Sequence, residues 1–226
     1  MRRDSSRPAR DPFRSRAAIL DAAEKLFADK GFDATSLNEV GAAAGVSRGT
    51  PGYFFGSKAD LYQAVLDRCF GEVREAVRAG RARALSSNRS GEDILAGAVS
   101  DYFDFLAARP NFVRLIEREA LSPNGRALSG GGHVTAGQEA LAAISDELGL
   151  DSSPSGDASQ LLLSVIALCW FPLVHARTVA PAVGITFEEL GDFERRKCHV
   201  VSLVVHGLRG LSAPIHSLLT EPARHG

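Results

Sequence analysis

Apolar residues recur at intervals of three and four along most of the chain, which is the spacing of one face of an α-helix. Runs that alternate apolar and polar residues, as a half-buried strand would, are hard to find. Within residues 14–30, for example, Ile19, Ala23 and Phe27 lie on one stripe, and Gly31 ends the pattern. The pattern therefore predicts an all-α fold.

The same reading predicts nine helices, bounded by capping residues, glycines and prolines. We expect them over residues 14–30, 36–44, 47–54, 57 to at least 77, 92–108, 110–121, 133–148, 158–179 with a kink at Pro172, and 187–211. The Ser-, Gly- and Pro-rich segments between them are expected to be loops, linkers or turns over residues 122–132, 151–157 and 180–186.

The helix expected over residues 47–54 is unusual, because two glycines and a proline in eight residues lower its helix propensity. Ser36 and Glu39 match a capping box for the helix before it, and Gly45 allows a sharp turn between the two. Ser47 is expected to cap the short helix. Two helices joined by such a turn form a helix-turn-helix, and small residues suit a helix that enters a DNA major groove.

Several stretches of residues 16–66 follow, without gaps, the pattern of a known family. They are Ala18–Ala23, Leu26-Phe27, Gly31-Phe32, Thr35–Leu37, Ala44–Thr50, Phe55 and Ser57-Lys58. In this region the chain resembles the N-terminal domain of the TetR family of transcriptional regulators. Beyond it, only the helical content, the length and residues 109–112 are similar to the family.

The resemblance implies that residues 47–54 form a recognition helix. Arg48 can donate two hydrogen bonds to guanine and is the expected base reader, and Lys58 is expected to contact phosphate. The full set of expected DNA contacts is Thr35, Ser36, Ser47, Arg48, Gly49, Thr50, Tyr53 and Lys58. The chain departs from the family at Pro51-Gly52, where many members have Leu-Tyr or Ile-Tyr.

The resemblance also implies a homodimer, because two copies of the motif must be held apart to bind a palindromic operator. The apolar helices over residues 158–179 and 187–211 are the expected interface; the alternative is that they only fill the protomer's own core. A small hydrophobic effector is expected between aromatic helices. The expected pocket residues are Tyr102, Phe103, Leu106, Phe112, Leu115, Ile116, Trp170, Phe171 and His175.

Composition agrees with an ordinary globular protein: the 226 residues are 45% hydrophobic and 23% charged, with a net charge of -1. Six Arg against two Asp in the first sixteen residues predict a flexible basic arm. Three scattered cysteines favour a reducing compartment, and no signal peptide or membrane span is expected. The expected location is therefore cytoplasmic.

The predicted domains are a flexible arm over residues 1–13, a helix-turn-helix DNA-binding domain over 14–60, and a helical effector-binding and dimerisation domain over 61–226. No phosphate loop or nucleophile motif appears, and no His or Cys pair has close zinc spacing, so we expect no enzyme, cofactor or metal site. The expected partners are double-stranded DNA, a small-molecule effector and a second copy. The alternative is a helical ligand-binding or catalytic protein that has lost DNA binding, which Pro51-Gly52 favours.

Overall fold

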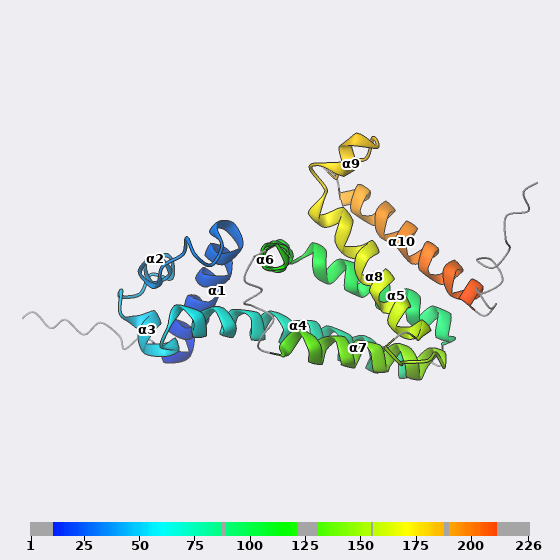
Figure 1. Cartoon of the computed structure of the whole chain (residues 1–226), viewed down its shortest axis with the longest axis horizontal. Helices are drawn as coiled ribbons and strands as arrows, with labels where there is room; N and C mark the ends of the chain where they lie inside the picture. Colours follow the sequence, from blue (N-terminus) through cyan, green and yellow to red (C-terminus); the bar gives the residue numbers. More distant parts are fainter. Residues whose placement is uncertain (1–10, 87–88, 122–130, 155, 188–189, 212–226) are drawn as a thin grey trace, which may run out of the picture. The chain divides into compact units, whose positions relative to one another are not determined.

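The computed structural model describes residues 11–86, 89–121, 131–154, 156–187 and 190–211. All regular secondary structure in these residues is helical (Figure 1), which confirms the predicted all-α class. Of the basic arm predicted over residues 1–13, residues 1–10 lie outside the described residues, and residues 12 and 13 are helical rather than flexible, because Asp11 caps a helix that begins there. Residues 122–130 of the predicted loop also lie outside the described residues.

Ten helices follow one another in the described residues. They are α1 (Pro12–Lys30), α2 (Leu37–Ala43), α3 (Thr50–Phe55), α4 (Lys58–Leu85), α5 (Gly91–Ala107), α6 (Pro110–Ala120), α7 (Gly132–Leu148), α8 (Asp157–Val174), α9 (Val179–Ala182) and α10 (Leu190–Leu211).

Two predicted boundaries are wrong. The helix expected over residues 158–179 runs through Pro172 and ends at Val174, where His175 is its C-cap and leaves the helical conformation. The segment 180–186, predicted to be a turn, overlaps the short helix α9. Elsewhere the predicted and observed ends agree within a few residues, as expected where helix termini fray.

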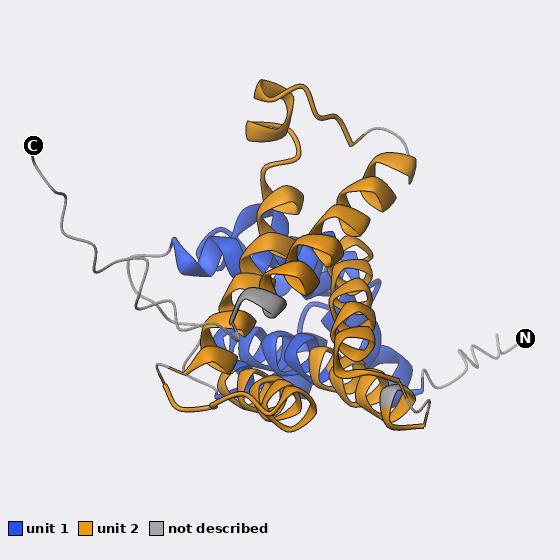
Figure 2. Cartoon of the chain, turned by 90° about the vertical axis from the view of Figure 1, so that its right-hand side faces the viewer, with its two compact units in different colours: residues 1–71, 110–133 blue, residues 72–109, 134–226 orange. Residues whose placement is uncertain are grey.

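The helices form two compact units (Figure 2). Unit 1 comprises residues 1–71 and 110–133, and unit 2 comprises residues 72–109 and 134–226. Helix α4 contributes residues to both. Helix α6 groups with α1, α2 and α3, whereas the sequence assigned residues 110–121 to the C-terminal domain.

The core of unit 1 lies between α1, α2, α4 and α6. Ile19, Ala23 and Phe27 of α1 are fully buried, as their stripe predicts, and Val40 of α2 is buried with them. Tyr62 of α4 meets Phe27 edge-on, with 4.8 Å between ring centroids. This packing holds α2 and α3, which are too short to be stable alone.

In unit 2, α5 packs against both α8 and α10, and α8 packs against α10. By length and composition, α8 is the one helix of the described residues that could cross a membrane, and a single such helix is weak evidence for a span. One face of α8 is buried at Val165 and Cys169, while Leu163 and Phe171 on other faces are 63% and 50% exposed. Helix α8 therefore carries apolar side chains both inside the unit and on its surface.

Candidate nucleic-acid interface

The first helix of the motif begins with the predicted capping box. Ser36 Oγ accepts a hydrogen bond from the Glu39 N–H at 3.2 Å, and Glu39 Oε2 accepts one from the Ser36 N–H at 2.9 Å. Lys30 of α1 reaches the same carboxylate at 2.9 Å. The Lys30 bond, and after it those from Ser36, lowers the pKa of Glu39 to about 2. The start of α2 is thus tied to the end of α1.

The turn between α2 and α3 is shaped by glycine and proline. Gly45 has a φ of 64°, a conformation that residues with a Cβ rarely adopt. A Cβ on Gly41 would lie 3.2 Å from the Ser47 carbonyl oxygen and 3.4 Å from Pro51 Cγ, so the two helices approach closely there. Pro51 is buried in the first turn of α3, where its missing N–H costs no helical hydrogen bond. The departure at Pro51-Gly52 therefore preserves the packing of the motif.

The prediction that Ser47 caps the short helix is wrong. Residues 47–50 form a turn in which the Thr50 N–H donates to the Ser47 carbonyl at 3.0 Å, so the helix begins at Thr50 and its N-cap is Gly49. The Ser47 and Thr50 hydroxyls bond each other at 2.6 Å instead. Both hydroxyls remain near the surface at the start of α3.

The face of α3 away from the core is uncovered within the described chain. Tyr53 is 86% exposed, Arg48 and Gly49 are exposed, and a Cβ added at Gly49 or Gly52 would meet no atom within 4 Å. Arg48 makes no hydrogen bond or ion pair with the residues that the structure describes. This face therefore presents the unpaired guanidinium of Arg48 and the exposed phenol of Tyr53. Its glycines leave room for another molecule to approach the backbone closely.

Thr35 does not belong to this surface, which corrects its place among the expected DNA contacts. Its side chain is 2% exposed, and its hydroxyl donates to the carbonyl of Gly31 at 2.8 Å and is 3.4 Å from that of Leu26. Thr35 therefore closes the end of α1. Its polar group is satisfied internally, as buried hydroxyls generally are.

Lys58 is likewise engaged within the protein. Its Nζ donates to the carbonyls of Phe32 and Asp33 at 2.9 and 3.3 Å and lies 4.4 Å from the centroid of the Phe32 ring. Because the side chain is only half-buried, its charge still contributes to the potential of this surface. In this arrangement Lys58 holds the turn between α1 and α2.

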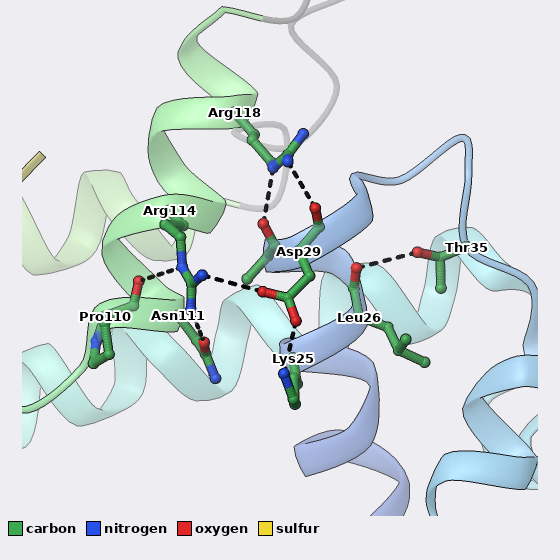
Figure 3. A network of polar contacts seen from close by, with 9 residues as sticks. Lys25, Leu26, Asp29, Thr35, Pro110, Asn111, Arg114 and Arg118 are labelled. Carbon is green, nitrogen blue, oxygen red and sulfur yellow. Dashed lines mark hydrogen bonds and ion pairs between the residues drawn. The ribbon is translucent and has the colours of Figure 1, made fainter. Parts of the chain in front are cut away.

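An arginine of α6 caps the C-terminus of α1 (Figure 3). Arg118 Nε donates to the Ala28 carbonyl at 2.8 Å, and its Nη2 donates to the Asp29 carbonyl at 2.7 Å. Arg114, one turn earlier, pairs with the Asp29 carboxylate at 3.2 Å. Cations at this end of a helix satisfy its free carbonyls and oppose its dipole. Sequence reading missed this contact, since nothing local marks two segments so far apart in the chain.

A second link joins α6 to α4. The Tyr62 hydroxyl donates to the Glu119 carboxylate at 2.8 Å, and both side chains are buried. Burial, and then this carboxylate, raises the pKa of Tyr62. Glu119 is thereby used inside unit 1, so α6 is fixed to the DNA-binding helices from two sides.

The nine expected pocket residues divide between the two units. Phe112, Leu115 and Ile116 lie in unit 1. The other six lie in unit 2, on α5 and α8, which pack together, and at the C-cap of α8. They are Tyr102, Phe103, Leu106, Trp170, Phe171 and His175.

Those six residues differ in burial. Phe103 and Leu106 are almost fully buried, whereas Phe171 is 50% exposed and packs its ring against that of His175, with 4.4 Å between centroids. His175 Nδ1 is also 3.2 Å from the Thr178 hydroxyl.

Comparison with known proteins identifies the N-terminal part of the chain. Two short helices around a glycine turn, with an uncovered second helix, define a helix-turn-helix DNA-binding domain. Residues 19–65 match the family model described as bacterial regulatory proteins, tetR family. The chain thus carries the DNA-binding domain of the TetR family, which confirms the resemblance seen over residues 16–66.

Curated relatives are named as regulators. The chain is 35% identical over 101 residues to the HTH-type transcriptional activator FasR of Mycolicibacterium smegmatis, covering 45% of this chain and 44% of FasR. It is 30% identical over 125 residues to the HTH-type transcriptional repressor NicS of Pseudomonas putida, covering 52% and 57%. The matches thus span about half the length of these two relatives.

Solved structures share the fold over most of the chain. The transcriptional regulator SCO4942 from Streptomyces coelicolor has a TM-score of 0.64 and 23% identity, with 85% of this chain and 97% of that chain covered. A TetR-like regulator from Rhodococcus sp. RHA1 has a TM-score of 0.60 at 23% identity, with 87% and 96% covered. At this identity the likeness concerns the fold of the C-terminal helices and not their ligand.

Proposed function

We propose that the protein is a transcriptional regulator that binds a palindromic operator as a homodimer and is released from it by a small hydrophobic ligand. The observation that carries the proposal is the uncovered face of α3 within a TetR-family DNA-binding domain. Repression is the proposed sign of regulation. The curated relatives include both a named activator and named repressors.

Roles at the DNA follow from the chemistry of each exposed group. Arg48 reads guanine through its O6 and N7 acceptors, which a guanidinium matches with two parallel hydrogen bonds. Ser47, Thr50 and Tyr53 offer hydroxyls to phosphates, which position the helix without reading sequence. Gly49 lets the backbone approach the groove closely.

Ser36, Thr35 and Lys58 act from behind this surface. The Ser36 N–H already donates to Glu39, Thr35 is buried, and Lys58 holds backbone carbonyls. We therefore assign them to the positioning of α2 and α3, with Lys58 adding positive potential for the phosphates.

The proposed dimer uses the outer faces of α8 and α10. Leu163 and Phe171 of α8 and Leu203 of α10 are between 49% and 63% exposed. Val200 and Val204 of α10 are buried in the protomer's own core, so they do not belong to this outer face. A symmetric copy over the outer faces would cover the exposed apolar groups and hold two α3 helices about 34–36 Å apart.

The proposed place of action is the cytoplasm, where the DNA lies. No enzymatic activity is proposed, and the curated relatives reported above are regulators.

A mobility-shift assay tests this function. The full chain is titrated against the DNA upstream of its own gene and against a shuffled fragment of equal length and composition. We expect tighter binding of the upstream fragment, loss of that preference in Arg48→Ala, and retention in Arg177→Ala, which removes one exposed arginine of unit 2. Equal affinity of the wild-type protein for both fragments, or no binding to either, would contradict the proposal. It would favour a ligand-binding protein that does not bind DNA.

A further inference from the structure

Most positively charged side chains of unit 1 are held by the protein itself. Those with a carboxylate or backbone carbonyl as partner are Lys25, Lys30, Lys58, Arg68, Arg114 and Arg118. Within the described part of unit 1, the cations that have no such partner are Arg14, Arg16 and Arg48. Arg48 is the proposed base reader, so the two arginines of α1 remain without an assigned role.

Arg16 lies against α3, in the part of unit 1 where the first turns of α1 meet that helix (Figure 1). Its guanidinium is 5.0 Å from the centroid of the ring of Phe55, the last residue of α3. A guanidinium over an aromatic face is attracted by the ring, which holds it in place while its N–H groups stay available. The side chain is exposed. Arg16 is therefore a positioned and accessible cation beside the proposed recognition helix.

A row of aromatic rings connects Arg16 to the exposed ring of Tyr53. From Phe55 the ring contacts run to Phe54, with 6.5 Å between centroids, and from Phe54 to Tyr53, with 5.4 Å. Tyr53 and Phe13 are the most exposed aromatic residues of the described chain, at 86% and 85%. Phe13 lies three residues before Arg16 and therefore shares its side of α1. A partner that covers this row would also cover the two exposed rings.

The acidic residues of α1 and its cap that are nearest to Arg16 along the chain have other partners. Asp11 Oδ1 accepts the N–H of Phe13 at 3.0 Å as the N-cap of α1, and Asp21 pairs with Arg68 at 2.6 Å. An anion that binds at Arg16 therefore meets a positive charge that the described residues do not neutralise.

The place of Arg16 beside α3 fits the sugar-phosphate backbone of DNA. A helix with its side chains is about 10–12 Å across and the major groove is about 12 Å wide, so a helix in the groove leaves the groups that flank it at the groove's edge. Phosphates line that edge, and they carry the negative charge that Arg16 lacks within the described chain. Because Arg16 belongs to α1 and not to α3, it meets the backbone and not the base edges.

We propose that Arg16 binds a phosphate of the operator backbone beside the groove that α3 enters, and that Arg14 does not. Residues two positions apart on a helix do not share a face, so Arg14 points away from the side that meets Phe55. The inference rests on the proposed function. It adds to the same DNA interface a contact from α1, which contributes affinity and fixes the position of α3 without reading sequence.

The salt dependence of DNA binding tests this contact. Full-length wild type, Arg16→Gln and the matched control Arg14→Gln are titrated against the upstream and the shuffled fragment from about 50 to 200 mM KCl. Arg16→Gln should make the plot of log affinity against log salt shallower by about 1 for each bound subunit, because one phosphate contact is lost. Its affinity for both fragments should fall by the same factor, so the preference for the upstream fragment is kept. Arg14→Gln should change the slope by less than half as much.

Two further variants separate the charge of Arg16 from its bulk. Arg16→Lys keeps the charge and should keep the wild-type slope. Arg16→Met removes the charge but keeps a long side chain over Phe55, so it should lose the same slope as Arg16→Gln. Thermal melting checks that each variant is folded, and if Arg16→Gln is not, Arg16→Met decides in its place.

A slope in folded Arg16→Gln or Arg16→Met equal to that of wild type would overturn the inference. Equal losses in Arg16→Gln and Arg14→Gln would also overturn it, because they would reflect only the total charge of this segment. A wild-type protein that prefers the upstream fragment without any effect of Arg16 keeps the proposed function and loses this contact. Equal binding of both fragments, with a slope that depends on Arg16, keeps the contact and contradicts the proposed function. Absence of DNA binding would refute both.

Discussion

Single side chains around the helix-turn-helix differ in whether they face the protein or the solvent. Thr35 and Lys58 fit the family pattern, yet both are bound to backbone carbonyls of unit 1. Arg48 and Tyr53 fit the same pattern and face outward. A residue pattern predicts the kind of residue at each position. It does not predict the partner of a long side chain, which depends on carbonyls brought close only by folding.

Glu39 should make the stability of the fold depend on pH. Its pKa is lowered from 4.5 to about 2 by Lys30 and Ser36, so its stabilising effect is complete above pH 4.5 and is lost as the pH falls towards 2. Urea unfolding across this range should show a shallower loss of stability in Glu39→Gln than in wild type. Some dependence remains, because Asp29 and Asp60 also have lowered pKa values. Identical pH profiles for the two proteins would contradict this assignment.

At the scale of helices, start signals were predictable and long-range contacts were not. The capping box at Ser36 is present as predicted, since it depends on residues three positions apart, and Ser57 caps the start of α4 through the Asp60 N–H in the same way. The Arg118 cap of α1 is not local, and the true start of α3 depends on how Pro51 packs against Gly41. The sequence therefore determined the helices better than their contacts.

Substitutions at two glycines can distinguish an effect on the stability of the fold from an effect on DNA binding by α3. Gly52 and Gly137 are both helical, and a Cβ at either meets no atom within 4 Å. Replacing either by Ala should stabilise the fold by up to about 1 kcal/mol. Only Gly52→Ala should weaken binding of the upstream DNA, by about tenfold or more, because its new methyl group lies on the face that enters the groove.

Thermal melting measures the change in stability of each variant, and mobility shift measures the change in its affinity for the upstream DNA. If Gly52→Ala were more stable and bound DNA as wild type does, the close approach of α3 would be refuted.

Arg118 should contribute more to the free energy of unfolding than Arg114 on the same helix. Arg118→Ala leaves two α1 carbonyls without their donor and should cost about 1 to 2 kcal/mol of unfolding free energy. Arg114→Ala removes an exposed ion pair and should cost less than about 0.5 kcal/mol. Urea unfolding of both variants provides the comparison, and equal losses would show that Arg118 does not cap α1.

At the scale of the whole molecule, the fold class and the family domain were predictable, while the membership of α6 was not. Apolar periodicity fixes which residues of a helix are inside, as at Phe112 and Leu115. It does not say which unit buries them, and here they belong with α1 and α4 rather than with α5. The expected pocket joined residues of both units for this reason.

The proposed dimer makes a prediction at the same scale. Leu163→Glu places a charge on the outer face of α8 and should give a monomer with weakened operator binding, since an interface core excludes unpaired charge. Val134→Glu makes the same change at a residue of α7 that is 47% exposed and should leave the dimer intact. Light scattering on both variants decides, and a Leu163→Glu protein that remains dimeric would place the interface elsewhere.

Protection of guanine N7 from dimethyl sulfate on the bound upstream DNA tests the central claim most directly, because that atom is the proposed acceptor for Arg48. We predict two symmetry-related protected guanines about one helical turn apart, and loss of that protection in Arg48→Ala at protein concentrations that still saturate the DNA. A bound complex with no protected guanine, or with the same protection in Arg48→Ala, would show that α3 does not read the major groove through this residue.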